Sequence, residues 1–455
     1  MRGRLTTSVL ITLAFVMTVL VVAGWGAFGA MSRMMALPTA PSAETGALPE
    51  PAPQAVSAVE RPVALVLASS AGTEITDLVA PAAVLAASGA FEVRIVAPSR
   101  IAVPLTGGID LLPDIALNDP LLRQRRVALV VVPLFLDASN PDILAGLRAL
   151  AGAGAHVLSV CEGARTVAAA GLFEGLPATT HFFALDSLAK KHPGVAWRSG
   201  ARFITGERVS SSAGVTAALD ATLAVVAQLA GTAAARRAVN SLGLIEHGQG
   251  VESPELDFAE IGVLLVGAGF GGRPAQVGVV VPAGVDELQL AALLDLHPRS
   301  FRAVPRTLSL APGWLVSRHG LRLRARGVLG EAAGLDELVV AAGDDDGAAL
   351  AAARGLANRD GLPLEDLAQV VPGRSFDHVL DGIARRVDVT TARVAAEMVE
   401  WPWRAAREVP PGIERPRAWP WSATLRALGW GSAGALLAAW VLTRGRHLAG
   451  VRRHG

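Results

Sequence analysis

AHVLSVCEGARTVAAAGLF, residues 155–173, contains the only cysteine among the 455 residues of the chain. The apolar run 155–160 is typical of a buried strand, and the alanine-rich run after the cysteine is typical of a helix. A side chain at such a turn is exposed at the carboxyl edge of a parallel sheet, near a helix N-terminus that favours a thiolate. Gly163 suits the tight turn. Spacing alone leaves two interpretations of Cys161 open, a buried spectator and a nucleophile.

Further apolar runs and helical patterns alternate on both sides of this stretch. Short β-rich runs occupy 63–70, 91–98 and 127–133, and helical patterns occupy 76–89, 140–154 and 218–231. Asn140 followed by Pro141 is a typical helix start. Strands that alternate with helices predict an α/β fold with a doubly wound parallel sheet, a flavodoxin-like sandwich with a nucleophile elbow, over residues 61–240.

The chain then repeats this pattern in a degenerate form. Residues 277–297, 335–357 and 375–398 have the same order of strand, turn and apolar helix as parts of 61–240, and Glu287 matches Asp77. Nothing within 355–375 matches the stretch around the cysteine. We therefore predict a second, degenerate α/β unit at 275–400 that lacks the elbow.

Two apolar segments predict transmembrane helices at 9–31 and 425–443. The first has 22 uncharged residues from Val9 to Ala30, enough to cross a hydrocarbon core about 30 Å thick. Arginines precede the first segment and follow the second, which places residues 1–8 and 444–455 in the cytoplasm by the positive-inside rule. The expected location is the inner membrane, with both soluble units outside the cytoplasm. A Pro- and Ala-rich linker (32–60) and a juxtamembrane segment (401–424) join them to the spans.

Several other functions are disfavoured by the sequence. The net charge of +1 gives no basic field for nucleic acid, and one cysteine excludes a CxxC metal site. IGVLLVGAGFGG (261–272) contains G-x-G-x-x-G after an apparent apolar strand, but another strand pattern follows at once where a dinucleotide-binding turn needs a helix. We expect a glycine-rich connector at 241–274, and neither a metal nor a cofactor.

The stretch 159–197, together with 202–231 and the turn at Asp77, resembles the ThiJ/PfpI superfamily, whose fold is that of the class I glutamine amidotransferases. The resemblance is closest to the N-terminal domains of GlxA-type regulators and to isonitrile hydratases, and it covers residues 61–240. It implies that Cys161 is the elbow nucleophile, His181 the histidine of the TTH motif, and Asp77 the acid beside the thiol. Glu162 and the turn after Pro133 would supply backbone N–H groups to an oxyanion. The Gly-Gly pair of many members is replaced by PLFLD in this chain.

Two classes of function stay open. In the first, a membrane-anchored protein binds or senses a small molecule or an oxidant at Cys161. In the second, Cys161 attacks an amide, isonitrile or glyoxal-type carbon, with Asp77 and His181 moving protons. Expected partners are a small-molecule ligand or substrate and the lipid bilayer, with a homodimer left open and no nucleic acid. The fold hosts both classes and does not choose between them.

Overall fold

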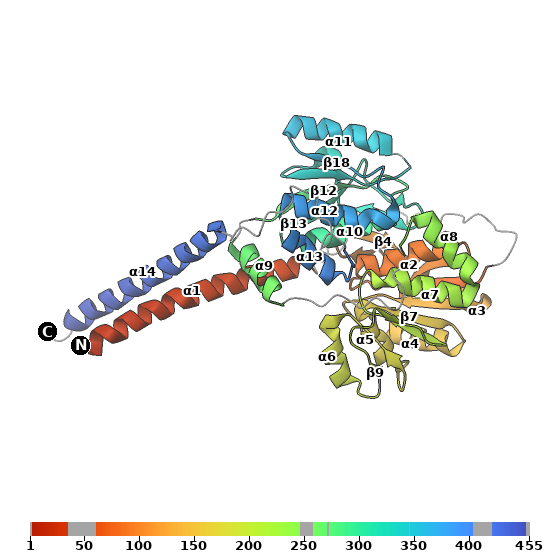
Figure 1. The fold of residues 1–455 in the computed structure, drawn as a ribbon, viewed down its shortest axis with the longest axis horizontal. Coiled ribbons are helices and arrows are strands. Elements are labelled where there is room, and N and C mark those ends of the chain that lie inside the picture. The colour runs from red at the N-terminus through yellow and green to blue at the C-terminus, as the bar shows by residue number, and fades with distance from the viewer. Residues whose placement is uncertain are drawn as a thin grey trace.

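A computed structural model describes residues 2–34, 61–245, 258–270, 273–344, 346–403 and 421–451. Most of the predicted linker, part of the connector, most of the juxtamembrane segment and the end of the basic tail lie outside these ranges. The described chain forms two α/β units, one packed on the other, from which a pair of long helices projects (Figure 1).

The first unit is built on a seven-stranded sheet with the strand order β10-β11-β7-β6-β1-β2-β5. Its central strands pair in parallel and are almost wholly buried, as their continuous apolar sequences require. Helices cover both faces, so the doubly wound α/β sheet is confirmed. The strands are β1 (Val63–Leu67), β2 (Glu92–Ala97), β5 (Ile115–Ala116), β6 (Val127–Val132), β7 (His156–Val160), β10 (Phe203–Ile204) and β11 (Val209–Ser212).

The helices of the first unit divide into two layers. One layer shares a core with the second unit and contains α2 (Ile75–Ser88), α7 (Ala217–Ala230) and α8 (Thr232–Leu242). The other layer lies on the opposite face of the sheet and contains α4 (Pro141–Gly152), α5 (Ala164–Ala169) and α6 (Phe182–Lys191). Asn140 caps α4 through hydrogen bonds from the N–H groups of Asp142 and Ile143, as the sequence predicts. The remaining short elements are α3 (Leu121–Gln124), β8 (Pro177–Ala178) and β9 (Ala196–Trp197).

The second unit has a five-stranded sheet in the order β16-β13-β12-β17-β18. Taken in chain order, these strands correspond to β5-β2-β1-β6-β7 of the first sheet. A strand, β18, occupies the place of β7 within 355–375, where the sequence comparison finds no match. That the second unit is a degenerate copy of the first stays a prediction. The strands are β12 (Ala275–Val280), β13 (Ala303–Ser309), β16 (Gly327–Val328), β17 (Glu337–Val340) and β18 (Leu364–Asp366), and the helices are α10 (Glu287–Arg299), α11 (Asp346–Asp360), α12 (Ser375–Arg386) and α13 (Val389–Met398).

The two units share a core and a sheet. Helix α10 packs along α2, and a four-stranded sheet in the order β14-β15-β4-β3 crosses the boundary. In this sheet Arg324 lies opposite Asp110, and the fully buried Asp110 carboxylate accepts hydrogen bonds from Arg324 and Arg326. These buried contacts fix the second unit against the first. The strands are β3 (Val103–Leu105), β4 (Ile109–Leu112), β14 (Leu315–Val316) and β15 (Arg322–Ala325).

Helices α1 (Arg2–Met34) and α14 (Trp421–Val451) lie side by side, and their outer ends, the two ends of the chain, are close together (Figure 1). Within them, Thr7–Gly29 and Leu425–Leu442 are long and apolar enough to cross a membrane. A Cβ at Gly434 would lie 2.1 Å from the hydroxyl of Thr18, and one at Gly431 would lie 2.4 Å from the ring of Phe15. Small residues therefore permit the close approach of the two helices.

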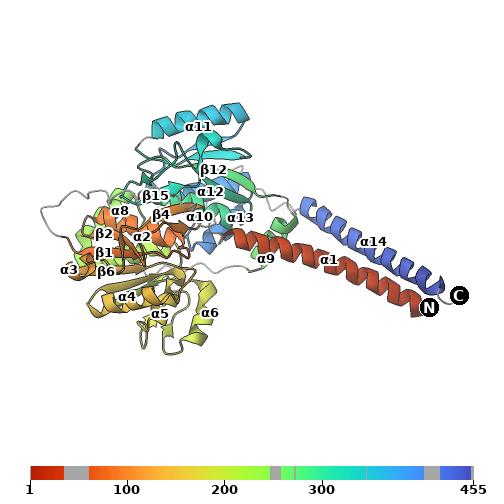
Figure 2. The same ribbon diagram turned by 180° about the vertical axis from the view of Figure 1, so that it is seen from behind.

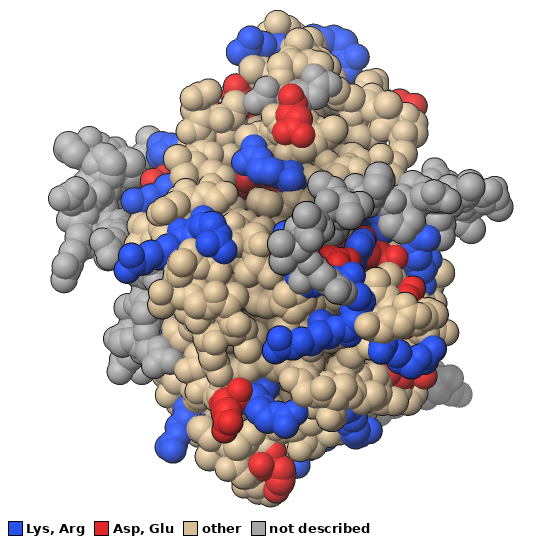
Figure 3. Space-filling view, turned by 90° about the vertical axis from the view of Figure 1, so that its right-hand side faces the viewer, with Lys and Arg blue, Asp and Glu red and all other residues tan. Residues whose placement is uncertain are grey.

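The predicted connector contains a helix, which corrects the reading of 261–266 as a strand. Helix α9 (Phe258–Phe270) contacts α1, α14 and α13, and it lies between the helix pair and the second unit in both views (Figures 1 and 2). Ile261, Leu264 and Phe270 of this helix are buried, a tertiary contact that local sequence patterns do not reveal. On the end of the molecule opposite the helix pair, Lys and Arg side chains gather across the middle of the surface (Figure 3).

Candidate functional site

The structure places Cys161 on a strained turn between β7 and α5. Its φ of 55° lies in the left-handed region, which a non-glycine residue occupies at a cost. The turn passes so close to β6 that a Cβ at Gly163 would lie 2.0 Å from the carbonyl oxygen of Val132. Only glycine fits there without a shift of the backbone. The strand, the strained residue and the helix form the elbow that the sequence predicts.

The thiol of Cys161 is buried, and the residue is 4% exposed. Burial, followed by the nearby carboxyl groups of Asp77, Glu162 and Glu74, raises the pKa of the thiol well above its usual value. The carbonyl oxygen of Cys161 accepts a hydrogen bond of 3.0 Å from the hydroxyl of Thr180. The TTH motif therefore supports the elbow through its second threonine.

Asp77 lies on the first turn of α2 and is completely buried. Its Oδ2 accepts a hydrogen bond of 3.1 Å from the N–H of Leu134, whereas Oδ1 has no hydrogen-bond partner in the described part of the chain. Burial and the neighbouring Glu74 raise the pKa of Asp77 well above its usual value. These effects favour the protonated form of Asp77, which places no negative charge beside the thiol.

Glu74 belongs to the same site, although it is not among the residues predicted from the sequence. Its side chain caps α2 by accepting a hydrogen bond of 2.6 Å from the N–H of Asp77. The residue is 2% exposed, and burial raises its pKa. The spacing of an acid at the N-cap and a second acid three residues later is the signal that could have identified the pair.

The predicted oxyanion donor after Pro133 is partly wrong. The N–H of Leu134 is already donated to Asp77, and its carbonyl accepts from the N–H of Glu74. Thr73 and Phe135 form a bridge between the same two segments. The PLFLD loop is thereby tied to the start of α2, and the N–H of Leu134 is not available to a substrate oxygen in this arrangement.

His181 is buried, but its ring forms a hydrogen bond to the second unit and not to Cys161. Its Nε2 lies 3.1 Å from the carbonyl oxygen of Met398, to which the neutral ring donates. Burial lowers the pKa of His181 to about 4, so the ring is neutral at pH 7. Its place in the sequence beside Thr180 keeps it near the elbow. A direct role in proton transfer to the thiol stays a prediction.

Glu162 follows the cysteine directly, yet its side chain is engaged at the surface. Its Oε2 pairs with Nε of Arg165 at 2.6 Å, and the carboxylate is 21% exposed. Arg165 in turn donates to the hydroxyl of Ser187. The side chain of Glu162 is thus bound to α5. Its charge raises the pKa of the Cys161 thiol, whereas its backbone N–H lowers that pKa.

In the second unit, the position equivalent to Asp77 is occupied by an amide side chain. Gln289 is the third residue of α10, as Asp77 is of α2, and its Oε1 accepts from the N–H of Ala342. Its Nε2 donates to the carbonyls of Leu367 and Val370. Leu367 directly follows β18, as Cys161 follows β7. Because Glu74 and Asp286 are the N-caps of the two helices, the sequence match of Glu287 to Asp77 is off by two residues.

Glu287 has a different set of partners. It accepts hydrogen bonds from Ser317 and from both the backbone and the ring of His319. These contacts lower the pKa of Glu287 and raise that of His319. The carboxylate thus anchors the turn between β14 and β15.

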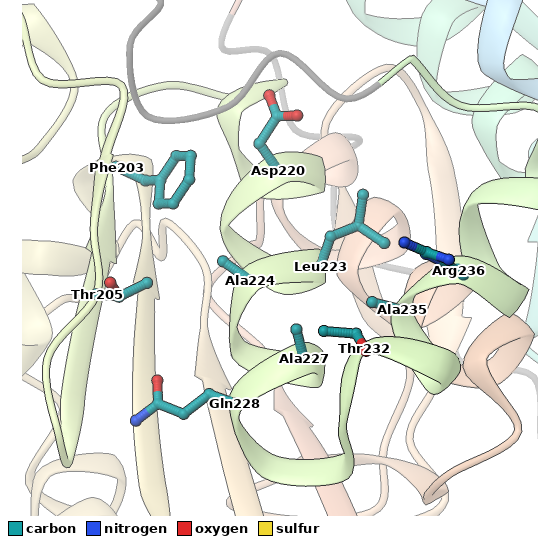
Figure 4. A pocket seen from close by; sticks show the side chains of 10 residues that line it. All are labelled: Phe203, Thr205, Asp220, Leu223, Ala224, Ala227, Gln228, Thr232, Ala235 and Arg236. Atoms are coloured by element: carbon teal, nitrogen blue, oxygen red, sulfur yellow. The ribbon is translucent and has the colours of Figure 1, made fainter.

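A separate cavity of about 520 Å³ lies between β10, α7 and α8. Phe203 and Leu223 line it together with the polar side chains of Asp220 and Arg236 (Figure 4). Cys161 is not among the residues that line this cavity. Asp220 is paired with Arg202 at 2.8 Å.

The fold and the site define an α/β protein with a cysteine at a nucleophile elbow. Residues 62–228 match the family model described as the DJ-1/PfpI family. This match confirms the predicted ThiJ/PfpI resemblance of residues 61–240. A comparison with curated proteins found no match.

Among solved structures, the chain is similar to a THiJ/PfpI family protein from Pseudomonas syringae, with 27% identity, 44% of this chain and 82% of the other covered, and a TM-score of 0.36. It is also similar to DJ-1beta of Drosophila melanogaster, with 19% identity, 41% and 100% coverage, and a TM-score of 0.37. An AraC family transcriptional regulator from Pseudomonas putida has 18% identity, 40% and 98% coverage, and a TM-score of 0.35.

Proposed function

We propose that the chain is a membrane-anchored sensor or binding protein, in which a small molecule or an oxidant acts at Cys161. In the described arrangement the thiol is buried and its pKa is raised. Because the thiolate is the nucleophilic form, a buried thiol with a raised pKa favours binding or sensing over catalysis. The observation that carries the proposal is the attachment of this site to the segment that leads toward the C-terminal apolar helix.

That attachment consists of three consecutive backbone carbonyls at the end of α13. Met398 accepts from His181, Val399 accepts from the N–H and hydroxyl of Thr216, and Glu400 accepts from Arg202. All three donors belong to the first unit. Because the last carbonyls of a helix have no partners within it, the first unit supplies them, and a change at the elbow can alter how α13 ends.

The same end of α13 touches the helices that carry the candidate spans. The side chain of Met398 belongs to an apolar cluster with Ile261 and Leu264 of α9, against which Met31 of α1 packs. Arg426 of α14 donates to the carbonyl of Phe270 at the end of α9. A continuous set of contacts thus runs from Cys161 through Thr180 and His181 to the helix pair, the kind of packed network that couples distant sites.

The alternative is a cysteine-dependent hydrolase or hydratase. The strained elbow and the protonated Asp77 favour it, since a buried acid beside a nucleophile can donate and accept a proton. Cys161 would add to an amide, isonitrile or glyoxal-type carbon, with His181 released from Met398 to move the second proton. Turnover of such a substrate that is lost in Cys161→Ser would support this function over sensing.

Intact-protein mass spectrometry tests the sensor directly, because Cys161 is the only thiol. Full-length protein in membrane vesicles is exposed to peroxide or to an alkylating agent, and hydrogen exchange of residues 396–401 is then followed. We expect modification of Cys161 to increase exchange there, and Cys161→Ser to show no response. A thiol that reacts only after unfolding, or a modified thiol with unchanged exchange, would contradict the proposal.

We further propose that α1 and α14 span the inner membrane and that both soluble units lie outside the cytoplasm. The support is the apolar length of Thr7–Gly29 and Leu425–Leu442 and the proximity of the two chain ends. Arginines flank both segments on that side. A reporter fused after residue 455 should be active only in the cytoplasm, and activity outside it would contradict this topology.

A further inference from the structure

The second unit contributes a buried arginine to the acidic end of α2. Arg299, the last residue of α10, has a side chain only 7% exposed, and its Nη2 lies 3.7 Å from Oε1 of Glu74. It also pairs with Asp295, one turn earlier in the same helix. Asp295 in turn accepts a hydrogen bond of 2.8 Å from the hydroxyl of Thr76. These contacts hold Arg299 at the Cys161 site although it belongs to the other unit.

The charges around Arg299 do not balance if every acid is ionised. The carboxyl groups of Glu74, Asp77 and Asp295 are all buried, with exposed fractions of 2%, 0% and 2%. One guanidinium cannot compensate three buried carboxylates, and an uncompensated buried charge is costly. At least one of the three acids must therefore hold a proton.

The contacts indicate which acid holds it. Arg299 is in contact with Glu74 and Asp295, whereas Asp77 accepts the N–H of Leu134 on Oδ2 and has the Glu74 carboxyl group as its neighbour. Oδ1 of Asp77 is free of hydrogen bonds within the described residues and can carry the proton. The other titratable groups nearby are the thiol of Cys161 and the ring of His181. The charge of Arg299 lowers the pKa of His181. Glu162 is bound to Arg165 at the surface.

We infer that Arg299 is a positioning residue of the Cys161 site: it holds Glu74 as the carboxylate, and the proton of the Glu74–Asp77 pair therefore resides on Asp77. A protonated Asp77 can donate a hydrogen bond to a thiolate, which offsets the cost of forming that thiolate in a buried site. The second unit, which has Gln289 and Leu367 in place of an acid and a nucleophile, thus sets the protonation state of the first. The inference rests on the proposed function in one respect, namely that Cys161 is the functional residue of the site.

Infrared spectroscopy of the full-length chain in detergent micelles tests this arrangement through the C=O stretch of protonated carboxyl groups. At neutral pH we expect one buried-acid band that Asp77→Asn abolishes. Arg299→Gln should add a second band that disappears in the double variant with Glu74→Gln. Arg299→Lys should restore the original spectrum by supplying a charge. Arg306→Gln is the matched control, because Arg306 donates to the carbonyl of Ala333 at the surface, and it should change nothing.

A purely structural Arg299 would give a different result. Arg299→Gln would then lower the melting temperature and leave both the single band and its pH titration unchanged, which would overturn the inference. If Arg299→Gln does not fold, Glu74→Gln decides, since loss of the neighbouring charge should move the titration of the Asp77 band to lower pH. An unshifted titration would again overturn it. Expected bands together with an inert Cys161 would support this inference and contradict the sensor.

Discussion

His181 and Met398 are joined by a hydrogen bond of 3.1 Å from the histidine ring to the backbone carbonyl, across 217 positions of the chain. The histidine that the TTH motif identifies is therefore one of the residues through which the first unit holds the end of α13. At neutral pH the ring is neutral and donates from Nε2, and burial disfavours its charged form.

Acid should weaken the fold through His181 in a way that a substitution can isolate. Burial lowers its pKa from 6.5 to about 4, so the unfolded chain takes up the proton first. Stability contributed by the neutral ring is fully present above pH 6.5 and is lost as the pH falls toward 4. The difference at pH 5 should be about 2 kcal/mol.

Urea unfolding of the full chain in micelles at pH 7 and pH 5 measures this loss. His181→Gln retains an amide donor and should show a smaller decrease between the two pH values, by about 2 kcal/mol. His297 provides the comparison, because its pKa is also lowered to about 4 and it remains in both proteins. Equal decreases in the wild type and in His181→Gln would show that the ring is not neutral and buried as described.

Gly163→Ala should destabilise the turn between β7 and α5, because there is no room for a Cβ at this position. The new methyl group would meet the carbonyl oxygens of Val132 and Pro133 at 2.0 and 2.8 Å, and neither backbone group can move without shifting β6. A cost of about 2–4 kcal/mol in the free energy of unfolding is expected. Gly152→Ala is the control, since nothing lies within 4 Å of its Cβ, and it should be neutral or slightly stabilising.

Gln289 should be essential to the second unit because its amide satisfies three backbone groups at once. Gln289→Ala leaves the N–H of Ala342 and the carbonyls of Leu367 and Val370 without this partner. Each net hydrogen bond contributes about 1 kcal/mol, which predicts a loss of about 2–4 kcal/mol by urea unfolding. Gln289→Glu should also destabilise, since a carboxylate cannot donate to the two carbonyls. Gln228→Ala, at an exposed amide, should cost less than about 1 kcal/mol.

The sequence predicts those parts of the molecule that local patterns determine. The apolar run into Cys161, Gly163 at the turn and the Asn140-Pro141 helix start each depend on neighbours in the chain, and each lies where it is expected. The doubly wound sheet follows from the alternation of such runs. Their interpretation does not require knowledge of distant contacts.

The parts that the sequence does not reveal depend on contacts between the units. Arg299 lies beside Glu74 only because α10 packs along α2, and Met398 meets His181 only because α13 ends on the first unit. The helical state of 258–270 likewise depends on burial against α1 and α14. The equivalence of Gln289 and Asp77 is not visible in the sequence, because a match by residue type pairs the acid Asp77 with the acid Glu287.

A disulfide between α1 and α14 tests their packing without a membrane assay. The Cβ of an added side chain at position 434 would lie 2.8 Å from the Cβ of Thr18. A separation of the helices by about 1 Å would give the Cβ–Cβ distance of about 3.5–4.5 Å that a disulfide requires, so Thr18→Cys with Gly434→Cys, in a Cys161→Ser background, should cross-link under mild oxidation. Thr18→Cys with Gly429→Cys is the matched control, because nothing lies within 4 Å of a Cβ at 429. The product is an internal loop that changes gel mobility only until it is reduced. Equal cross-linking of both pairs, or of neither, would show that the two helices do not pack through Gly434.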